Sequence, residues 1–338
     1  SKIKPKVDEC NKRLKAERNR AEDELNMKKE RFIEELDEYV RQAEAFATYG
    51  EIGRVSENCL ALNTLQSKTS EARERAEFIN GEEELLGQPK TVFEQLTAVP
   101  QIMAPYLALW MNTHEFTKNS YVWLNGPMSA VDPETLESDV GNLRREAIKS
   151  VKNFEADDTG ELRAPLKVAE DLRANIEEFK EKLPLISCLC NKGMRGRHWE
   201  EVSGIIGYSF KPNETTTLSA TLAMGLEKHM ERLEEIAGCA SKEYSLEKAL
   251  DKMFSEWQPL EFMLKEYRDT GTCIMAGNED VQALLDDHIV KSQTMLGSPF
   301  IKPFEDRARS WAKKLVLIQD LIDIWLKVQS VWQYLEPI

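Results

Sequence analysis

The chain has 338 residues, a formal net charge of −14 and a hydrophobic content of 41%. These values allow a sizeable core, but the acidic excess disfavours binding to nucleic acid or anionic lipid, which depends on clustered lysine and arginine. No segment is apolar over the ~20 residues that a membrane span requires, and the N-terminal segment SKIKPKVDEC lacks the apolar core of a signal peptide. We therefore expect a cytoplasmic protein that contacts neither nucleic acid nor membrane.

Six cysteines are spread along the chain, which fits reduced thiols in a cytosolic protein better than a disulfide framework. Cys188, Cys190 and His198 form the one cluster that suggests a metal site. The single residue between the two cysteines and the lack of a fourth ligand argue against zinc, and packing of small side chains is the better interpretation. The chain starts at Ser1 without a methionine and stops at Ile338, so we expect a piece of a longer polypeptide.

The first 81 residues are predicted to be helical. Residues 8–49 carry a narrow apolar seam among charged residues, made by Leu25, Phe32, Leu36, Tyr39, Ala43 and Phe46. One seam is typical of a helix that lies on a neighbour, although a coiled-coil arm would also show it. A second helix is expected over residues 56–80, capped by Asn80 and Gly81.

From residue 82 the charges thin out and aromatic residues begin, which predicts a compact unit. Pro100 should break its helical pattern, and Pro105 should bend it. The Asn125-Gly126 pair predicts a β-hairpin over residues 121–131, a signal that the following proline weakens.

Asp132 and Pro133 have the residue types that begin a helix. The helix after them shows one apolar face, made by Leu136, Val140, Leu143, Ala147, Val151 and Phe154. Another helix should run from Pro165 to about Pro184. A short apolar run then leads into a basic loop at residues 192–197.

The next segment is predicted to contain helices and a second hairpin. Residues 218–257 read as mostly helical, and residues 260–276 as a hairpin. Asn278 should cap a helix over residues 281–296.

The last helix is the element that the sequence marks most clearly, at residues 303–335, with no glycine or proline after its first residue. Its first seam consists of Phe304, Ala308, Trp311, Leu315, Ile318, Ile322, Trp325, Gln329 and Trp332. A second seam consists of Leu317, Leu321, Ile324, Val328, Val331 and Leu335. Because the two seams cover about half of the circumference, we expect the C-terminal half of this ~50 Å helix to be held between two neighbouring layers, with Trp325 buried.

Four short motifs resemble known sites but lack an essential part. Residues 81–91 separate the lysine of a phosphate loop from its glycine and insert a proline. Residues 155–166 begin like a calcium loop, but Leu166 stands where the bidentate glutamate belongs. Residues 193–196 have the spacing of an RNA-clamping loop without a basic surface. Asp286, Asp287 and His288 resemble an acid-base group, but the two adjacent carboxylates point about 100° apart on one helix. We therefore expect no catalytic, cofactor-binding or metal-binding residue.

These elements predict a mainly α fold, an elongated array of helical bundles with one or two short β-hairpins and a long C-terminal helix. The expected parts are a helical segment at 1–81, a bundle at 82–200 with a hairpin near 121–131, and a bundle at 201–338 with a hairpin near 260–276 and the helix 303–335. Taken alone, this pattern supports a non-catalytic mechanical or scaffold element.

A set of separated segments occurs in a recognisable order along the chain. They are residues 109–124, residues 197–210 beginning RHWE, residues 240–247, ALLDDHIVKSQ at 283–293, GSPFIKPF at 297–304, then Trp311, Leu315, Trp325, Gln329, Trp332 and LEPI at 335–338. In this order they resemble the linker region of dynein heavy chains. The resemblance covers residues 85–338, while residues 1–80 match only loosely, as the neck before the linker. Its character is that of an axonemal heavy chain of the inner arms.

The resemblance implies a linker, or lever, that changes position over a AAA+ ring during the ATP cycle and produces the power stroke along microtubules. ATP and magnesium would bind in the ring of the parent chain, with no cofactor in this part. The implied partners are the ring of the same heavy chain, the microtubule through the parent motor, and dynein intermediate and light chains through the tail. The implied location is the cytoskeleton, in the axoneme of a cilium or flagellum.

Three alternatives stay open on the sequence alone. One is an enzyme with its site in the central region of residues 188–210. A helical scaffold or tether unrelated to motors would have the same composition and seams. The basic loop at residues 192–197 is either a contact for an acidic surface of the ring or a solvated turn.

Overall fold

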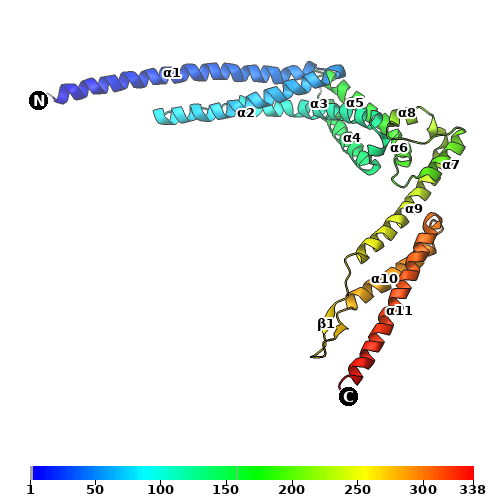
Figure 1. The fold of residues 1–338 in the computed structure, drawn as a ribbon. Coiled ribbons are helices and arrows are strands. Elements are labelled where there is room, and N and C mark those ends of the chain that lie inside the picture. The colour runs from blue at the N-terminus through cyan, green and yellow to red at the C-terminus, as the bar shows by residue number, and fades with distance from the viewer. Residues whose placement is uncertain (1–2, 158) are drawn as a thin grey trace. The chain divides into compact units, whose positions relative to one another are not determined.

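The computed structural model describes residues 3–157 and 159–338, and these fold almost entirely into helices (Figure 1). The described residues form 11 α-helices and one two-stranded antiparallel sheet, which confirms the predicted mainly α class. The chain divides into two compact units, residues 1–183 and residues 184–338.

Unit 1 is built around five long helices. They are α1 (Ile3–Ala45), α2 (Val55–Leu86), α3 (Gln95–Asn125), α4 (Pro133–Glu155) and α5 (Arg163–Glu181). Helices α1 and α2 lie side by side (Figure 1), and the predicted seam of α1 is buried from Leu25 to Phe46. Helix α1 therefore lies on its neighbours with this seam, whereas residues 6–21 are exposed on every side within the described chain.

Helix α2 is longer than predicted, so the cap expected at residues 80–81 is wrong. It ends instead at Gly87, whose φ of 71° is the left-handed conformation that favours glycine. The additional turns bring the buried Glu83 against the loop that follows. There its carboxylate accepts hydrogen bonds from the Thr91 N–H (2.7 Å), the Thr91 hydroxyl and the Lys29 ammonium (3.0 Å). These contacts from outside the helix override the local glycine signal.

Pro100 and Pro105 both lie inside the single helix α3, so the break predicted at Pro100 is wrong. Proline has no N–H to bond the carbonyl of Leu96, four residues earlier. That carbonyl instead accepts a hydrogen bond from the Arg73 guanidinium of α2 (3.2 Å). Packing of α3 against α1, α2 and α4 offsets the remaining cost of an interior proline, which is ~3 kcal/mol.

The hairpin predicted over residues 121–131 is also wrong. Residues 121–125 are the end of α3, and a short 3-10 helix, Met128–Ala130, follows the turn. The Asn-Gly pair marks the position of the turn correctly. The segment before it is helical because Trp123 packs on Phe179 of α5, with ring centroids 5.5 Å apart.

The start of α4 follows the prediction. The Asp132 carboxylate accepts a hydrogen bond from the Thr135 N–H (3.2 Å), and Pro133 is the first helical residue. All six residues of the predicted apolar face are buried, and at its end Phe154 stacks on Tyr106 at 5.8 Å. Helix α5 begins two residues before the predicted start and ends near the predicted end.

Unit 2 contains shorter helices, a hairpin and two long helices. Its helices are α6 (Leu183–Leu189, which begins at the last residue of unit 1), α7 (Gly196–Ile206), α8 (Leu218–Leu222), α9 (Met230–Trp257), α10 (Glu279–Leu296) and α11 (Glu305–Leu335). Strand β1 (Leu264–Glu266) pairs antiparallel with β2 (Cys273–Met275), with Leu264 opposite Met275. This confirms the hairpin predicted near residues 260–276.

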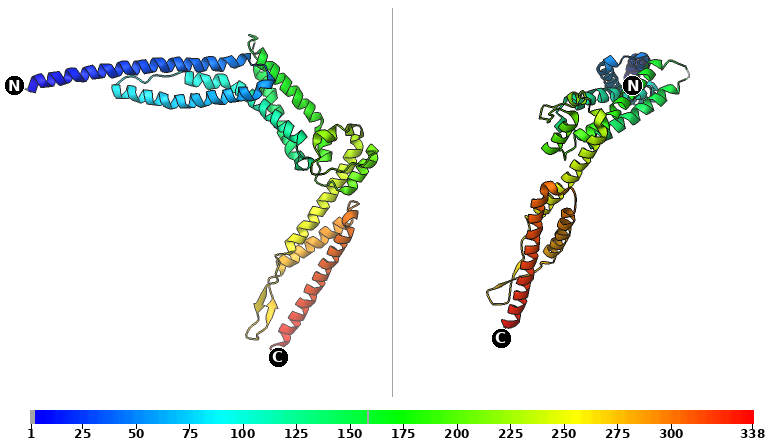
Figure 2. Two further views of the ribbon diagram at one scale, coloured as in Figure 1. Left: turned by 45° about the horizontal axis from the view of Figure 1, so that its top comes forward. Right: turned by 90° about the vertical axis from the view of Figure 1, so that its right-hand side faces the viewer.

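Helix α11 runs without a break, which confirms the predicted long terminal helix. A 3-10 turn that contains Pro303 precedes it. In Figure 2, α10 lies along α11 and the hairpin lies near the C-terminal end of α11. The hydrophobic cluster that α11 joins in this unit consists of Leu250, Met253, Val281, Leu285, Met295, Ile301, Ala308, Trp311, Leu315 and Ile322.

The second seam of α11 is exposed, so the prediction that its C-terminal half is held between two layers is wrong for the described chain. All six residues of this seam are exposed, and 53% of Trp325 is accessible to solvent. Heptad spacing shows where a helix can pack. It does not show which polypeptide covers the seam.

Candidate interaction surface

Helix α11 divides its apolar residues between two sides. On the buried side, the Trp311 ring lies 4.2 Å from that of Phe254 and 6.3 Å from that of Trp257, measured between ring centroids. The other side, which we name the open face, consists of the exposed residues Leu317, Leu321, Ile324, Trp325, Val328, Val331 and Leu335. At ~100° per residue the centres of the two sides are roughly 140° apart, so one helix cannot bury both against the same neighbour.

The open face has the spacing of a helix-packing seam. Apart from Trp325, its residues from Leu317 to Leu335 recur at intervals of four and three over ~27 Å of helix. A soluble monomer rarely exposes contiguous apolar patches larger than a few hundred Å², and larger ones mark contacts with other proteins. The face contains no titratable or nucleophilic side chain, so its chemistry is burial of apolar surface.

The β-hairpin is fastened to α11 next to this face. The Gln329 amide makes two hydrogen bonds to the backbone of Met275: the Met275 N–H donates to Oε1 (2.7 Å), and Nε2 donates to the Met275 carbonyl (2.9 Å). Tyr267 packs edge-on against Trp332, with centroids 5.4 Å apart. The role of Gln329 was not predicted, although a lone amide in an apolar seam is a signal that could have revealed it.

The basic loop at residues 192–197 is anchored within unit 2. Arg195 pairs with Glu247 of α9 (2.9 Å), and Arg197 pairs with Glu243 of the same helix. These pairs engage both arginines of the loop, which weakens the hypothesis that it meets an acidic surface elsewhere.

Two buried histidines connect helices of unit 2. The Nδ1 of His198 accepts a hydrogen bond from the Arg195 N–H (3.0 Å), and its Nε2 lies 3.1 Å from Glu243. Burial lowers the pKa of His198 below its ordinary value despite the nearby carboxylate. The Nδ1 of His288 accepts from the Trp257 indole (2.8 Å), and its Nε2 lies 3.0 Å from a carboxylate oxygen of Glu256. The His198 ring thus joins α7 to α9, and the His288 ring joins α10 to α9.

The acid-base motif at residues 286–288 is divided between surface and core. Asp287 forms an ion pair with Lys291 on the surface of α10 (2.5 Å), whereas His288 is buried. The side chains therefore do not share a site.

The two cysteines of the cluster are buried thiols. Burial raises the pKa of Cys188 to about 11, with a further contribution from Glu234, and raises the pKa of Cys190 to about 12. Within residues 3–157 and 159–338, no three His, Cys, Asp or Glu side chains gather as a metal site would require.

The other rejected motifs bind parts of their own chain. Lys90 of the phosphate-loop-like segment pairs with Glu84 (2.9 Å). Asp157 of the calcium-loop-like segment accepts hydrogen bonds from the backbone N–H groups of Thr159 and Leu162. Across the part of the chain that the structure describes, no helix is long and apolar enough to cross a bilayer.

The uncovered apolar face of the long terminal helix is a surface for contact with other polypeptide, and comparison with known proteins identifies the family of the chain. Residues 96–338 match the family described as "Dynein heavy chain, N-terminal region 2". The chain therefore belongs to the dynein heavy chain family, which confirms the resemblance seen in the sequence. This is a motor-protein family, so a scaffold unrelated to motors is no longer a suitable alternative.

Three relatives illustrate the similarity. The chain is 42% identical to human dynein axonemal heavy chain 3 over 95% of its length, 36% identical to human dynein axonemal heavy chain 12 over 100%, and 37% identical to mouse dynein axonemal heavy chain 1 over 92%. It spans 8%, 11% and 7% of these relatives. All three are axonemal, which agrees with the expected location in the axoneme, part of the cytoskeleton of cilia and flagella.

Proposed function

We propose that this chain is the neck and the first part of the linker of an axonemal inner-arm dynein heavy chain. In this role it is a non-catalytic lever that changes position over the AAA+ ring during the ATP cycle and produces the power stroke. The observation that supports it best is α11, a helix of 31 residues that is packed on one side and apolar on the other.

A lever must resist bending, and the contacts of α11 supply part of that resistance. Bending a helix requires breaking backbone hydrogen bonds or separating packed side chains, and neither glycine nor proline interrupts α11 to make this easier. Its first half is held by the core of unit 2. We propose that the remaining chain of the heavy chain covers the open face and so holds the second half.

The other parts of the chain also have roles in this proposal. Residues 1–81 form the neck, and residues 82–200 and 201–338 form two bundles of the linker. The ring of the parent chain binds ATP and magnesium. The partners of this chain are that ring, the microtubule through the parent motor, and intermediate and light chains through the tail.

The test uses a full-length heavy chain with a charge placed in the open face. Leu321→Asp should reduce microtubule gliding velocity by more than about half while leaving basal ATPase activity in place, because burying an unpaired carboxylate is costly. Ser330→Asp adds the same charge at an exposed polar position of α11 and should leave gliding unchanged. Equal gliding by both variants and the parent would contradict the proposal.

A further inference from the structure

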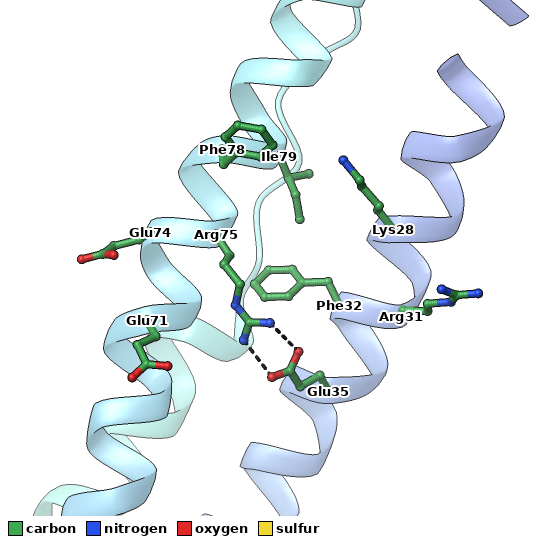
Figure 3. Close-up of a pocket in the computed structure, with 9 residues that line it drawn as sticks. All are labelled: Lys28, Arg31, Phe32, Glu35, Glu71, Glu74, Arg75, Phe78 and Ile79. Carbon is green, nitrogen blue, oxygen red and sulfur yellow. Dashed lines mark hydrogen bonds and ion pairs between the residues drawn. The ribbon is translucent and has the colours of Figure 1, made fainter. Parts of the chain in front are cut away.

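A groove runs between α1 and α2 of unit 1, separate from the open face (Figure 3). Its volume is 720 Å³. Phe32 of α1 and Ile79 of α2 are buried at its base, and Phe78 of α2 stands at its edge with 65% of its surface exposed. The groove thus has an apolar base and one large aromatic side chain that makes little contact with its own chain.

A bidentate ion pair bridges the centre of the groove. The Arg75 guanidinium makes two hydrogen bonds to the Glu35 carboxylate, at 2.7 and 2.8 Å, as the dashed lines in Figure 3 show. The same guanidinium lies 5.1 Å from the centre of the Phe32 ring. This pair and the ring contact join α1 to α2 across the groove.

The exposed aromatic is held in position. The Lys28 ammonium lies 5.7 Å from the centre of the Phe78 ring and also pairs with Glu82 one turn further along α2 (2.9 Å). Phe78 and Leu85 are seven residues apart, so they lie on one stripe of α2, and Leu85 is also exposed. Phe78 and Leu85 therefore form an apolar ridge on α2, and the Lys28 ammonium contacts the ring of Phe78.

Outside the Arg75–Glu35 pair at its centre, the groove has walls of opposite charge. Lys28 and Arg31 project from α1, whereas Glu71 and Glu74 project from α2 (Figure 3). Arg31, Glu71 and Glu74 form no ion pair with any residue in the described part of the chain. A groove with one basic and one acidic wall is complementary to a ligand that is acidic along one flank and basic along the other.

We propose that this groove binds an amphipathic α-helix of another polypeptide. Two adjacent helices present parallel ridges between which a third helix packs. The apolar stripe of the bound helix lies on Phe78, its acidic flank faces Lys28 and Arg31, and its basic flank faces Glu71 and Glu74. This inference concerns unit 1 and is independent of the lever proposal.

The first test measures binding of three labelled peptides to the chain by fluorescence anisotropy. Each has about 18 residues, long enough to be helical, and a leucine stripe. One carries glutamates on one flank and lysines on the other, the second glutamates on both flanks, and the third lysines on both. The mixed peptide should bind at least about fivefold more tightly than either of the others. Equal affinity of the three peptides, or no binding, would overturn the proposal.

The second test changes the groove. Phe78→Ala should weaken binding of the mixed peptide by about tenfold or more, as loss of an aromatic anchor does. Glu71→Lys replaces one of the two carboxylates of the acidic wall by an ammonium, which cancels the charge of that wall, and should shift the preference toward the glutamate-only peptide. Glu77→Lys is the matched control, since it makes the same charge change at an exposed position of α2 outside the groove. If Glu77→Lys shifts the preference as much as Glu71→Lys, the groove is not the binding site. Because all three positions are exposed, thermal melting should show that the variants fold.

Discussion

Gly193 lies where the loop before α7 touches α9, and a side chain does not fit there. A Cβ at this position would lie 2.2 Å from the Ala240 carbonyl oxygen. Gly193→Ala should therefore lower the free energy of unfolding by about 1 to 3 kcal/mol, as overpacking does. Gly204→Ala in α7 is the control, because no atom outside its own helix lies within 4 Å, and it should be neutral or stabilise by up to ~1 kcal/mol. Urea denaturation measures both changes, and equal effects would refute the steric explanation.

Glu83 makes the stability of unit 1 depend on pH. Burial favours its neutral form, but hydrogen bonds from Thr91 and Lys29 outweigh burial and hold the pKa of Glu83 below its ordinary value of 4.5. A lowered pKa in the folded state means that the ionised carboxylate stabilises the fold. This stabilisation is complete above pH 4.5 and is lost as the pH falls through the lower, folded-state pKa.

Glu83→Gln is expected to cost about 1 to 3 kcal/mol at neutral pH, because it weakens buried hydrogen bonds to a charged group. The difference in melting temperature between the parent chain and this variant should shrink as the pH is lowered below 4.5. Glu77→Gln, an exposed change on the same helix, should have little effect at any pH. A difference for Glu83→Gln that stays constant with pH would show that its carboxylate is not responsible.

At the level of whole elements, apolar periodicity predicted helices well and local breakers predicted their ends poorly. The faces of α1, α4 and the first half of α11 are buried as their spacing indicated. Gly81, Pro100 and the Asn125-Gly126 pair were each read as a break or a hairpin. At the first two positions α2 and α3 continue, because Glu83 accepts a hydrogen bond from Lys29 of α1 and Arg73 donates one to Leu96 of α3. Such partners are not visible in a local pattern.

The position of the apolar surface on α11 was predicted from the sequence. Whether that surface is buried or exposed was not predicted correctly. Both seams of α11 were identified by spacing, and the seam ending at Leu335 was expected to be buried. Its exposure could not be predicted, because spacing measures the capacity to pack and contains no information about the covering partner. The groove between α1 and α2 was missed altogether, since it depends on Lys28 of one helix meeting Phe78 of another.

Two of the three tryptophans of α11, Trp311 and Trp325, test its division into a buried and an open side. Only 6% of Trp311 is exposed, so Trp311→Ala should cost ~3 to 5 kcal/mol in this chain. Trp325 belongs to the open face, and Trp325→Ala should cost less than about 1 kcal/mol. Chemical denaturation of the two variants gives both values. A large loss of stability for Trp325→Ala would mean that the open face is covered within this chain.

At the scale of the whole protein, the chain is a small region of a heavy chain, since it spans 8% of the human axonemal heavy chain 3 to which it is similar. Unit 2 completes its own core yet leaves one face of its longest helix uncovered. We propose that the remainder of the heavy chain covers this open face, so that α11 is held on both sides in the motor.

Thiol labelling tests this claim most directly. Cysteine is placed at position 321 of the open face by Leu321→Cys and, as a control, at position 330 by Ser330→Cys, and maleimide labelling of each is followed by peptide mass spectrometry. Both cysteines should react readily in the chain of residues 1–338. In the full-length heavy chain, labelling after Leu321→Cys should slow by about tenfold or more, as burial limits access, while labelling after Ser330→Cys continues. Equal rates at position 321 in the two proteins would contradict the account.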